Sequence, residues 1–231
     1  MTSPPTSDMH KQLNLTLPFR TALGRDDFFV SPANAMAIGL IDSWPNWPSG
    51  KLVLAGAAGS GKTHLVHVWA TVSQAEIIAA KDVVNADIPL LAQGPVAVED
   101  VHAIRGDLAA QKALFHLHNL TLAEGNTLLL TGTADPKHWA LELPDLMSRM
   151  QGTTVATLDQ PDDMLLSVVM AKLFNDRQLM PSLDTIPYLV KHMDRSFETA
   201  QSLVARLDSL SMSEKRPITR ALAKRVLQDT L

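Results

Sequence analysis

The sequence predicts an α/β fold with a parallel sheet, followed by a small all-helical region. Three observations predict it. Short apolar runs suited to buried strands alternate with helical patterns over the first 160 residues. A glycine-rich stretch stands between one such run and the helical pattern after it, at Lys51–Leu65. From Pro161 onwards, only helical patterns appear. We therefore expect a flexible segment at residues 1–20, an α/β core at 21–160 and a helical lid at 161–231.

Composition limits the classes of protein that fit. A chain of 231 residues can bury a full core, and its net charge of −4 argues against a nucleic-acid binder with a basic surface all round. The absence of cysteine excludes disulfides and thiolate metal sites. The apolar runs are too short to cross a bilayer, and the polar start resembles no secretory signal. We expect a cytoplasmic protein with no membrane partner.

The stretch KLVLAGAAGSGKTHL has the spacing G-x-x-x-x-G-K-[ST], with Gly56 before the gap and Gly61, Lys62 and Thr63 after it. A tight loop can aim backbone N–H groups at phosphate oxygens only where side chains are absent. The lysine supplies a positive charge, the threonine hydroxyl a magnesium ligand, and the helix start a favourable dipole. The predicted phosphate-binding residues are Gly56, Gly59, Ser60, Gly61, Lys62, Thr63 and His64.

Before this loop, the segment Gln12–Phe19 alternates leucine with polar residues. It fits an edge strand of the sheet, or an extended peptide that docks alternate side chains into a partner's pockets. Further on, Phe29 and Val30 precede a predicted helix from about Pro32 to Trp44 with Ser31 as N-cap. The two apolar residues fit an adenine-binding site or plain core equally well.

After the phosphate loop, Ala75–Ala80 reads as a strand, and the apolar run at residues 96–98 as another that leads into Glu99 and Asp100. An acidic pair at the end of such a strand can place one carboxylate near magnesium and a second near the attacking water. These two residues are therefore predicted to be catalytic and to bind magnesium together with Thr63.

A helix is predicted at Asp107–Glu124, and the apolar strand after it ends at Thr133, beside the acidic strand, where a hydroxyl can sense the terminal phosphate. Arg149 follows in LPDLMSRM. An arginine here can stabilise charge on a nucleotide bound by a neighbouring subunit. On its own, this residue fits a surface arginine at a helix end as well.

The clearest helix of the lid runs from Ser196 to Leu210, with Asp194 as the predicted N-cap and Arg195 in the first turn. The last 18 residues predict a basic amphipathic helix, which fits a solvated helix face most simply and a contact with nucleic acid less well.

Together, GAAGSGKT, VAVEDVH, LLLTGT, LPDLMSR and MDRSFETAQSLVARL resemble the AAA+ ATPases of the bacterial DnaA replication-initiator family, over nearly the whole chain from Gln12 to Leu231. The resemblance implies an AAA+ P-loop three-layer fold and ADP or ATP with Mg²⁺ as ligands. It also implies these roles: Lys62 and Thr63 in Walker A, Glu99 and Asp100 in Walker B, Thr133 as first sensor, Arg149 as arginine finger and Arg195 as second sensor.

The amino-terminal segment is similar to the Q-L-x-L-x-[LF] peptide that binds the replication sliding clamp. The residues concerned are Gln12, Leu13, Leu15, Leu17 and Phe19. From this resemblance we expect neither the DNA-reading nor the amino-terminal domain of an initiator. The resemblance thus implies a negative regulator of replication initiation: bound to the clamp, it promotes ATP hydrolysis by a DnaA-type initiator through Arg149. The resemblance also implies that the protein contacts DNA indirectly and is nucleoid-associated through the clamp, while self-association stays open.

Two positions depart from the family pattern. The acidic pair runs Glu99 then Asp100, where the family usually shows aspartate first, and Thr133 replaces an acidic sensor. We therefore expect weak or no ATPase activity of the chain's own. The main alternative is a helicase-loader-like AAA+ protein that acts on single-stranded DNA, and a less favoured one is a small-molecule kinase.

Overall fold

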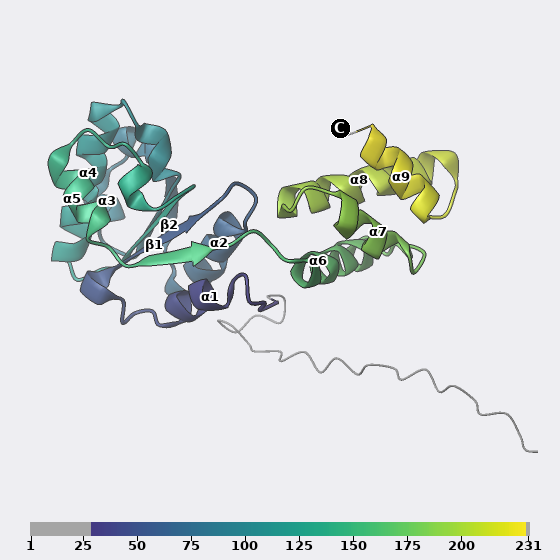
Figure 1. The fold of residues 1–231 in the computed structure, drawn as a ribbon. Helices are drawn as coiled ribbons and strands as arrows, with labels where there is room; N and C mark the ends of the chain where they lie inside the picture. Colours follow the sequence, from purple (N-terminus) through teal and green to yellow (C-terminus); the bar gives the residue numbers. More distant parts are fainter. Residues whose placement is uncertain (1–28, 230–231) are drawn as a thin grey trace, which may run out of the picture.

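The computed structural model describes residues 29–229 (Figure 1). The predicted docking peptide Gln12–Phe19 lies outside the described residues. In Figure 1, an α/β part precedes a separate group of helices, and the chain passes from one to the other after its last strand.

Five strands form one parallel sheet in the order β2-β3-β4-β1-β5. Strand β4 is central, and its neighbour β1 pairs with β4 on one side and with β5 on the other. The bounds are β1 Lys51–Gly56, β2 Glu76–Ala79, β3 Val96–Glu99, β4 Leu128–Gly132 and β5 Val155–Leu158. The predicted parallel sheet is confirmed, and all five carboxyl ends lie along one edge.

Helices cover both faces of the sheet. Because side chains alternate along a strand, Leu52 and Leu54 of β1 pack in a cluster with Trp69, whereas Val53 packs with Leu114 on the other face. The helices of this part are α1 Ala35–Asp42, α2 Lys62–Ser73, α3 Ile88–Leu91, α4 Leu108–Ala123 and α5 Pro144–Gln151, with short 3₁₀ turns at Pro48–Gly50, Ala80–Asn85, Val101–Ile104 and Pro136–His138. The predicted three-layer core is therefore confirmed.

The first helix begins later than expected. Ser31 was predicted as its N-cap, but α1 starts at Ala35. The Ser31 N–H donates to Asn34 Oδ1 over 2.8 Å, and the Asn34 N–H donates back to the Ser31 carbonyl over 3.1 Å. This closed turn uses the groups that would otherwise start the helix.

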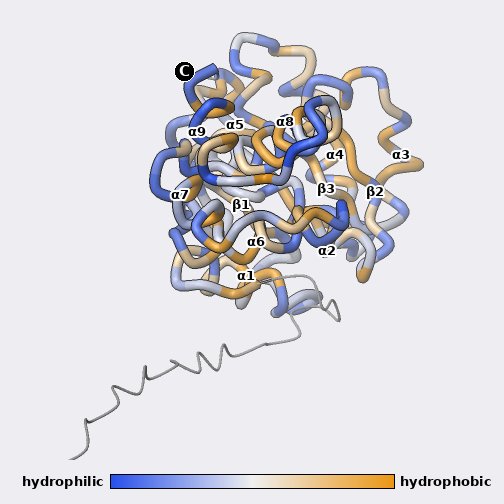
Figure 2. The backbone as a smooth tube through the Cα atoms, turned by 90° about the vertical axis from the view of Figure 1, so that its right-hand side faces the viewer, coloured by the Kyte–Doolittle hydropathy of each residue, from blue (hydrophilic) through white to orange (hydrophobic). Residues whose placement is uncertain are grey.

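The helical lid consists of α6 Asp163–Asp176, α7 Thr185–His192, α8 Phe197–Glu214 and α9 Arg220–Gln228. Their apolar stripes meet in one core that contains Leu166, Phe174, Leu207 and Val226. Figure 2 shows hydrophobic and hydrophilic residues alternating along the helices, as amphipathic packing requires. None of the described helices combines the length and apolar character that a membrane span needs.

The start of α8 also differs from the prediction. Ser196, not Asp194, is its N-cap: the Ser196 Oγ accepts from the Thr199 N–H over 3.2 Å. Arg195 consequently lies before the helix rather than in its first turn.

Candidate functional site

The glycine-rich loop joins the carboxyl end of β1 to the start of α2, which begins at Lys62. Gly59 and Gly61 have φ angles of +71° and +97°, a region that only glycine adopts at no steric cost. The Ser60 Oγ is buried and has no hydrogen-bond partner among the described residues. A hydroxyl left unpaired in this loop fits a site that donates hydrogen bonds to a bound group.

Lys62 is folded back onto the loop. Its Nζ donates to the Gly56 carbonyl over 2.7 Å and to the Ala57 carbonyl over 2.8 Å, and only 8% of the residue is exposed. Burial lowers the pKa of Lys62, while the carboxylates of Asp100 and Glu99 oppose that shift. The ammonium is therefore held at the loop with two carboxylates acting on it.

A cavity of about 610 Å³ opens over the loop. It brings together Lys62, Thr63, Asp100 and Thr133, which the sequence placed at one site from three different segments. Glu99 ends β3, half-buried, and does not line this cavity. The full lining is Ala58, Gly59, Gly61, Lys62, Thr63, His64, His67, Asp100, His102, Ala103, Thr133, Phe197, Glu198 and Gln201.

Asp100 sits at a sharp exit from its strand. Its φ is +57°, and its N–H donates to Thr131 Oγ1 over 3.0 Å. This bond ties the end of β3 to β4 and turns the carboxylate toward the cavity. A non-glycine residue held in the left-handed region is often found at a functional position.

Sequence reasoning missed an acidic side chain at this cavity. Glu198, in the first turn of α8, lines it, whereas Arg195 does not. The Arg195 Nη2 instead pairs with Asp163 Oδ1 at 2.6 Å. The sequence did carry a signal for a helix that starts at Phe197: a serine suits the N-cap position and a glutamate suits the first turn, as Ser196 and Glu198 do here.

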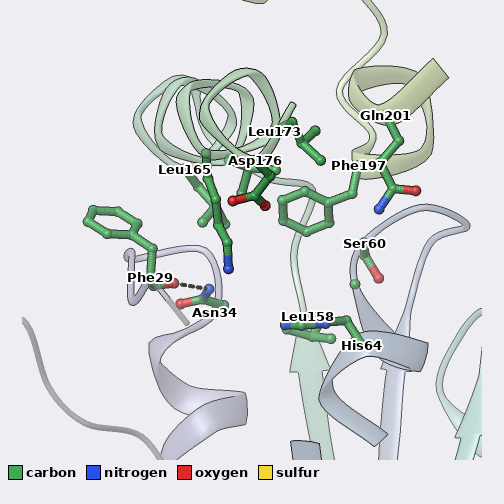
Figure 3. A pocket seen from close by; sticks show the side chains of 13 residues that line it. Phe29, Asn34, Ser60, His64, Leu158, Leu165, Leu173, Asp176, Phe197 and Gln201 are labelled. Atoms are coloured by element: carbon green, nitrogen blue, oxygen red, sulfur yellow. Dashed lines mark hydrogen bonds between the residues drawn. The ribbon is translucent and has the colours of Figure 1, made fainter. Parts of the chain in front are cut away.

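A second, mostly apolar cavity of about 300 Å³ lies between the loop, the segment just before α1 and the lid (Figure 3). Phe29 lines it, held in place by the Asn34 side chain, which donates to the Phe29 carbonyl over 3.0 Å. Val30 does not line it but packs against the apolar cluster that contains Leu54 and Trp69. The two cavities share Gly61, His64, Phe197 and Gln201, so they lie next to each other.

The lid touches the phosphate loop directly. The Phe197 N–H donates to the Gly59 carbonyl over 3.1 Å. A Cβ added to Gly59 would lie 2.4 Å from the Ser196 Oγ, and one added to Gly61 would lie 2.9 Å from the Phe197 ring. Both glycines thus serve two purposes, a backbone conformation and a close contact with α8.

Arg149 lies at the opposite edge of the sheet. It is exposed near the end of α5, and its carbonyl accepts from the Lys51 Nζ over 3.1 Å, at the start of β1. The phosphate loop begins where β1 ends, at Gly56. At about 3.3 Å per residue, the strand separates these two ends by about 17 Å. The structure therefore does not bring Arg149 to the phosphate-loop cavity.

The helix that carries Arg149 is fixed at both ends. At its start, the buried Gln111 Oε1 accepts from the N–H groups of Glu142 and Leu143 over 2.8 and 2.9 Å. At its end, Thr153 Oγ1 donates to the same Arg149 carbonyl over 2.8 Å. The bonds from Gln111 and Lys51, which belong to other elements, thus fix the position of α5 on the core, whereas the Thr153 bond only closes the end of the helix locally.

No family model matches this chain. Among solved structures, it is similar to domain III of the Thermotoga maritima replication initiation protein DnaA, with a TM-score of 0.77 and 18% identity over 87% of this chain and 94% of that one. It is also similar to AMPPCP-bound DnaA from Aquifex aeolicus (TM-score 0.69, 15% identity, 86% and 68% covered). A third similar structure is the Thermotoga maritima RuvB Holliday junction branch migration motor (TM-score 0.62, 18% identity, 78% and 61% covered). The chain therefore has a DnaA-like AAA+ fold.

Proposed function

We propose that this chain is a nucleotide-binding regulator of bacterial replication initiation that resembles Hda. It docks on the sliding clamp through Gln12–Phe19 and inserts Arg149 into the ATP site of a DnaA-type initiator. The initiator then hydrolyses its ATP.

The observation that carries this proposal is the position of Arg149. The residue is exposed, fixed to the core through its backbone, and about 17 Å of strand away from the loop of its own chain. A guanidinium in this position is available to a neighbouring molecule rather than to its own nucleotide. An arginine supplied in trans contributes on the order of 10³ to 10⁵ in rate to phosphoryl transfer.

The loop site supports nucleotide binding by the chain itself. Lys62 and the backbone from Gly59 to Thr63 would hold the phosphates, and Thr63 with Asp100 would hold Mg²⁺, which neutralises phosphate charge when bound. The apolar cavity beside Phe29 suits a base. That one of the similar DnaA structures binds AMPPCP supports a nucleotide as the ligand.

The same site supports a holding rather than a hydrolytic role. Glu99 does not line the cavity, Glu198 adds negative charge to it, and Arg195 is paired with Asp163. Nucleotide bound between the loop and α8 would hold the core and lid in one arrangement. We therefore assign the ATP-consuming step to the initiator and not to this chain.

The test is a hydrolysis assay with ATP-loaded initiator and DNA-loaded clamp. Wild type should stimulate hydrolysis, Arg149→Ala should lose the stimulation, and Lys137→Ala, an exposed cation elsewhere on the core, should keep it. Binding of the Arg149 variant to nucleotide and clamp should be unchanged. Full stimulation by Arg149→Ala would contradict the mechanism, and turnover that rises with single-stranded DNA alone would favour a helicase loader.

A further inference from the structure

Lys51 is a buried cation beside Arg149. The residue is 7% exposed, yet among residues 29–229 no carboxylate lies within ion-pair distance of its ammonium or of the Arg149 guanidinium. Buried charges are usually paired, because removing an ion from water is costly. Burial, and then the nearby Arg149, lower the pKa of Lys51. Two neighbouring positive charges without an anion call for an explanation.

The hydrogen bonds around this ammonium have a fixed direction. Lys51 Nζ lies 3.2 Å from His118 Nε2, and an ammonium can only donate, so Nε2 accepts. The imidazole proton is then on Nδ1, which donates to Asn119 Oδ1 over 3.1 Å. Burial lowers the pKa of His118 to about 4, so this ring is neutral near pH 7. The second N–H of Lys51 goes to the Arg149 carbonyl, and the third has no protein acceptor among the described residues.

Lys51 and Arg149 both line a polar cavity of about 410 Å³, a volume typical of small-ligand sites. Ser148 adds a hydroxyl to the wall. Asp145 is the one carboxylate among the described residues of the lining, and it forms no ion pair with Arg149. The complete lining is Ser49, Lys51, Phe115, Asp145, Ser148, Arg149 and Gly152.

We propose that Lys51 and Arg149 form one anion-binding site, and that its ligand is a phosphate group of the nucleotide held by the partner. This inference rests on the proposed function and names a second residue of the same site. Two N–H groups of Lys51 fix it to His118 and to the Arg149 backbone, and the third faces the phosphate. Such a paired arrangement binds a phosphate more tightly than a lone arginine does, because two cations share it.

The direct test uses inorganic phosphate and the isolated full chain, followed by NMR at the backbone amides of Ser148 and Gly152. Wild type should show saturable shifts at both amides, and Lys51→Met should bind phosphate about tenfold more weakly or worse, as expected for one charge-assisted hydrogen bond. The backbone amide of Gly61 reports phosphate bound at the glycine-rich loop before α2 and serves as an internal reference. Unsaturable shifts in wild type, or equal binding by Lys51→Met, would overturn the inference.

Thr153→Val is the matched control. It removes the other side-chain bond to the Arg149 carbonyl but changes no charge. Thr153→Val should keep phosphate binding. If it loses binding as Lys51→Met does, Lys51 acts only by holding the backbone and the anion site is refuted. Should Lys51→Met fail to fold, Lys51→Gln provides the same comparison.

The hydrolysis assay separates this inference from the proposed function. Lys51→Met should reduce the stimulation of initiator hydrolysis about tenfold or more, while Thr153→Val stays close to wild type. If wild type and Lys51→Met stimulate equally and Arg149→Ala does not, the inference fails while the proposed function stands. If wild type itself does not stimulate, the proposed function fails, and the phosphate titration still decides whether the anion site exists.

Discussion

The contact between lid and phosphate loop predicts the effect of adding one methyl group. In Gly59→Ala, the alanine backbone must adopt φ near +71°. Its Cβ would lie 2.4 Å from the Ser196 Oγ and 2.8 Å from the Ser196 Cβ. The backbone conformation costs about 1–2 kcal/mol. Overpacking against Ser196 adds about 1–3 kcal/mol, unless α8 moves away from the loop. We therefore expect Gly59→Ala to lower the free energy of unfolding by about 2–5 kcal/mol.

A matched control separates the two contributions. Gly125 has φ of +75° and nothing within 4 Å of an added Cβ, so Gly125→Ala should lose only the backbone part, about 1–2 kcal/mol. Ser196→Gly removes the obstructing side chain at little cost to the cap. Adding it to Gly59→Ala should therefore recover about 1–3 kcal/mol.

The measurement is urea unfolding without nucleotide, followed by far-UV circular dichroism. The difference between Gly59→Ala and Gly125→Ala reports the contact with α8. Equal losses in both variants, with no recovery by Ser196→Gly, would refute the packing of the lid on the loop.

Three further predictions concern the two sites. Lys62→Ala should abolish nucleotide binding, measured by calorimetry, while leaving the melting temperature of the nucleotide-free protein within a few degrees; wild-type affinity would remove the loop as the binding site. Glu198→Gln should tighten nucleotide binding several-fold, because a negative charge leaves the phosphate cavity, and unchanged or weaker binding would count against the placement of this carboxylate. His118 has a pKa of about 4 in the folded chain against an ordinary 6.5, so the unfolded chain binds more protons and stability falls as the pH drops from 6.5 to 4, by up to about 3 kcal/mol. His118→Gln should flatten that pH dependence in urea titrations, and an unchanged slope would assign it to other groups.

That these predicted residues meet at one cavity could be foreseen, because they follow parallel strands that lie side by side in the sheet. Lys62, Asp100 and Thr133 each follow an apolar run, and the carboxyl ends of parallel strands share one edge. The position of Glu198 was missed for a local reason: a two-residue change in the helix start decides whether Arg195 or Glu198 enters the cavity. Helix ends are the part of an element that sequence patterns determine least well.

Lys51 was missed for a different reason. In the sequence, it is merely the first residue of a buried strand, and its partners are 67 and 98 residues away. No local pattern joins β1 to α4 and α5 at that end of the sheet. Only the order of the strands and the packing of both helices bring Lys51, His118 and Arg149 together, so the tertiary structure was needed to find this site.

The placement of the two sites at opposite ends of β1 gives the domain a polarity. A contact that joins the Arg149 end of one such domain to the loop end of another uses two unlike surfaces, so it is heterologous and has no twofold axis. Each pair formed in this way leaves one Arg149 end and one loop end free. An assembly built from this contact is therefore polar: it either closes into a ring or stays an open chain whose two terminal members differ in what they offer to the next partner.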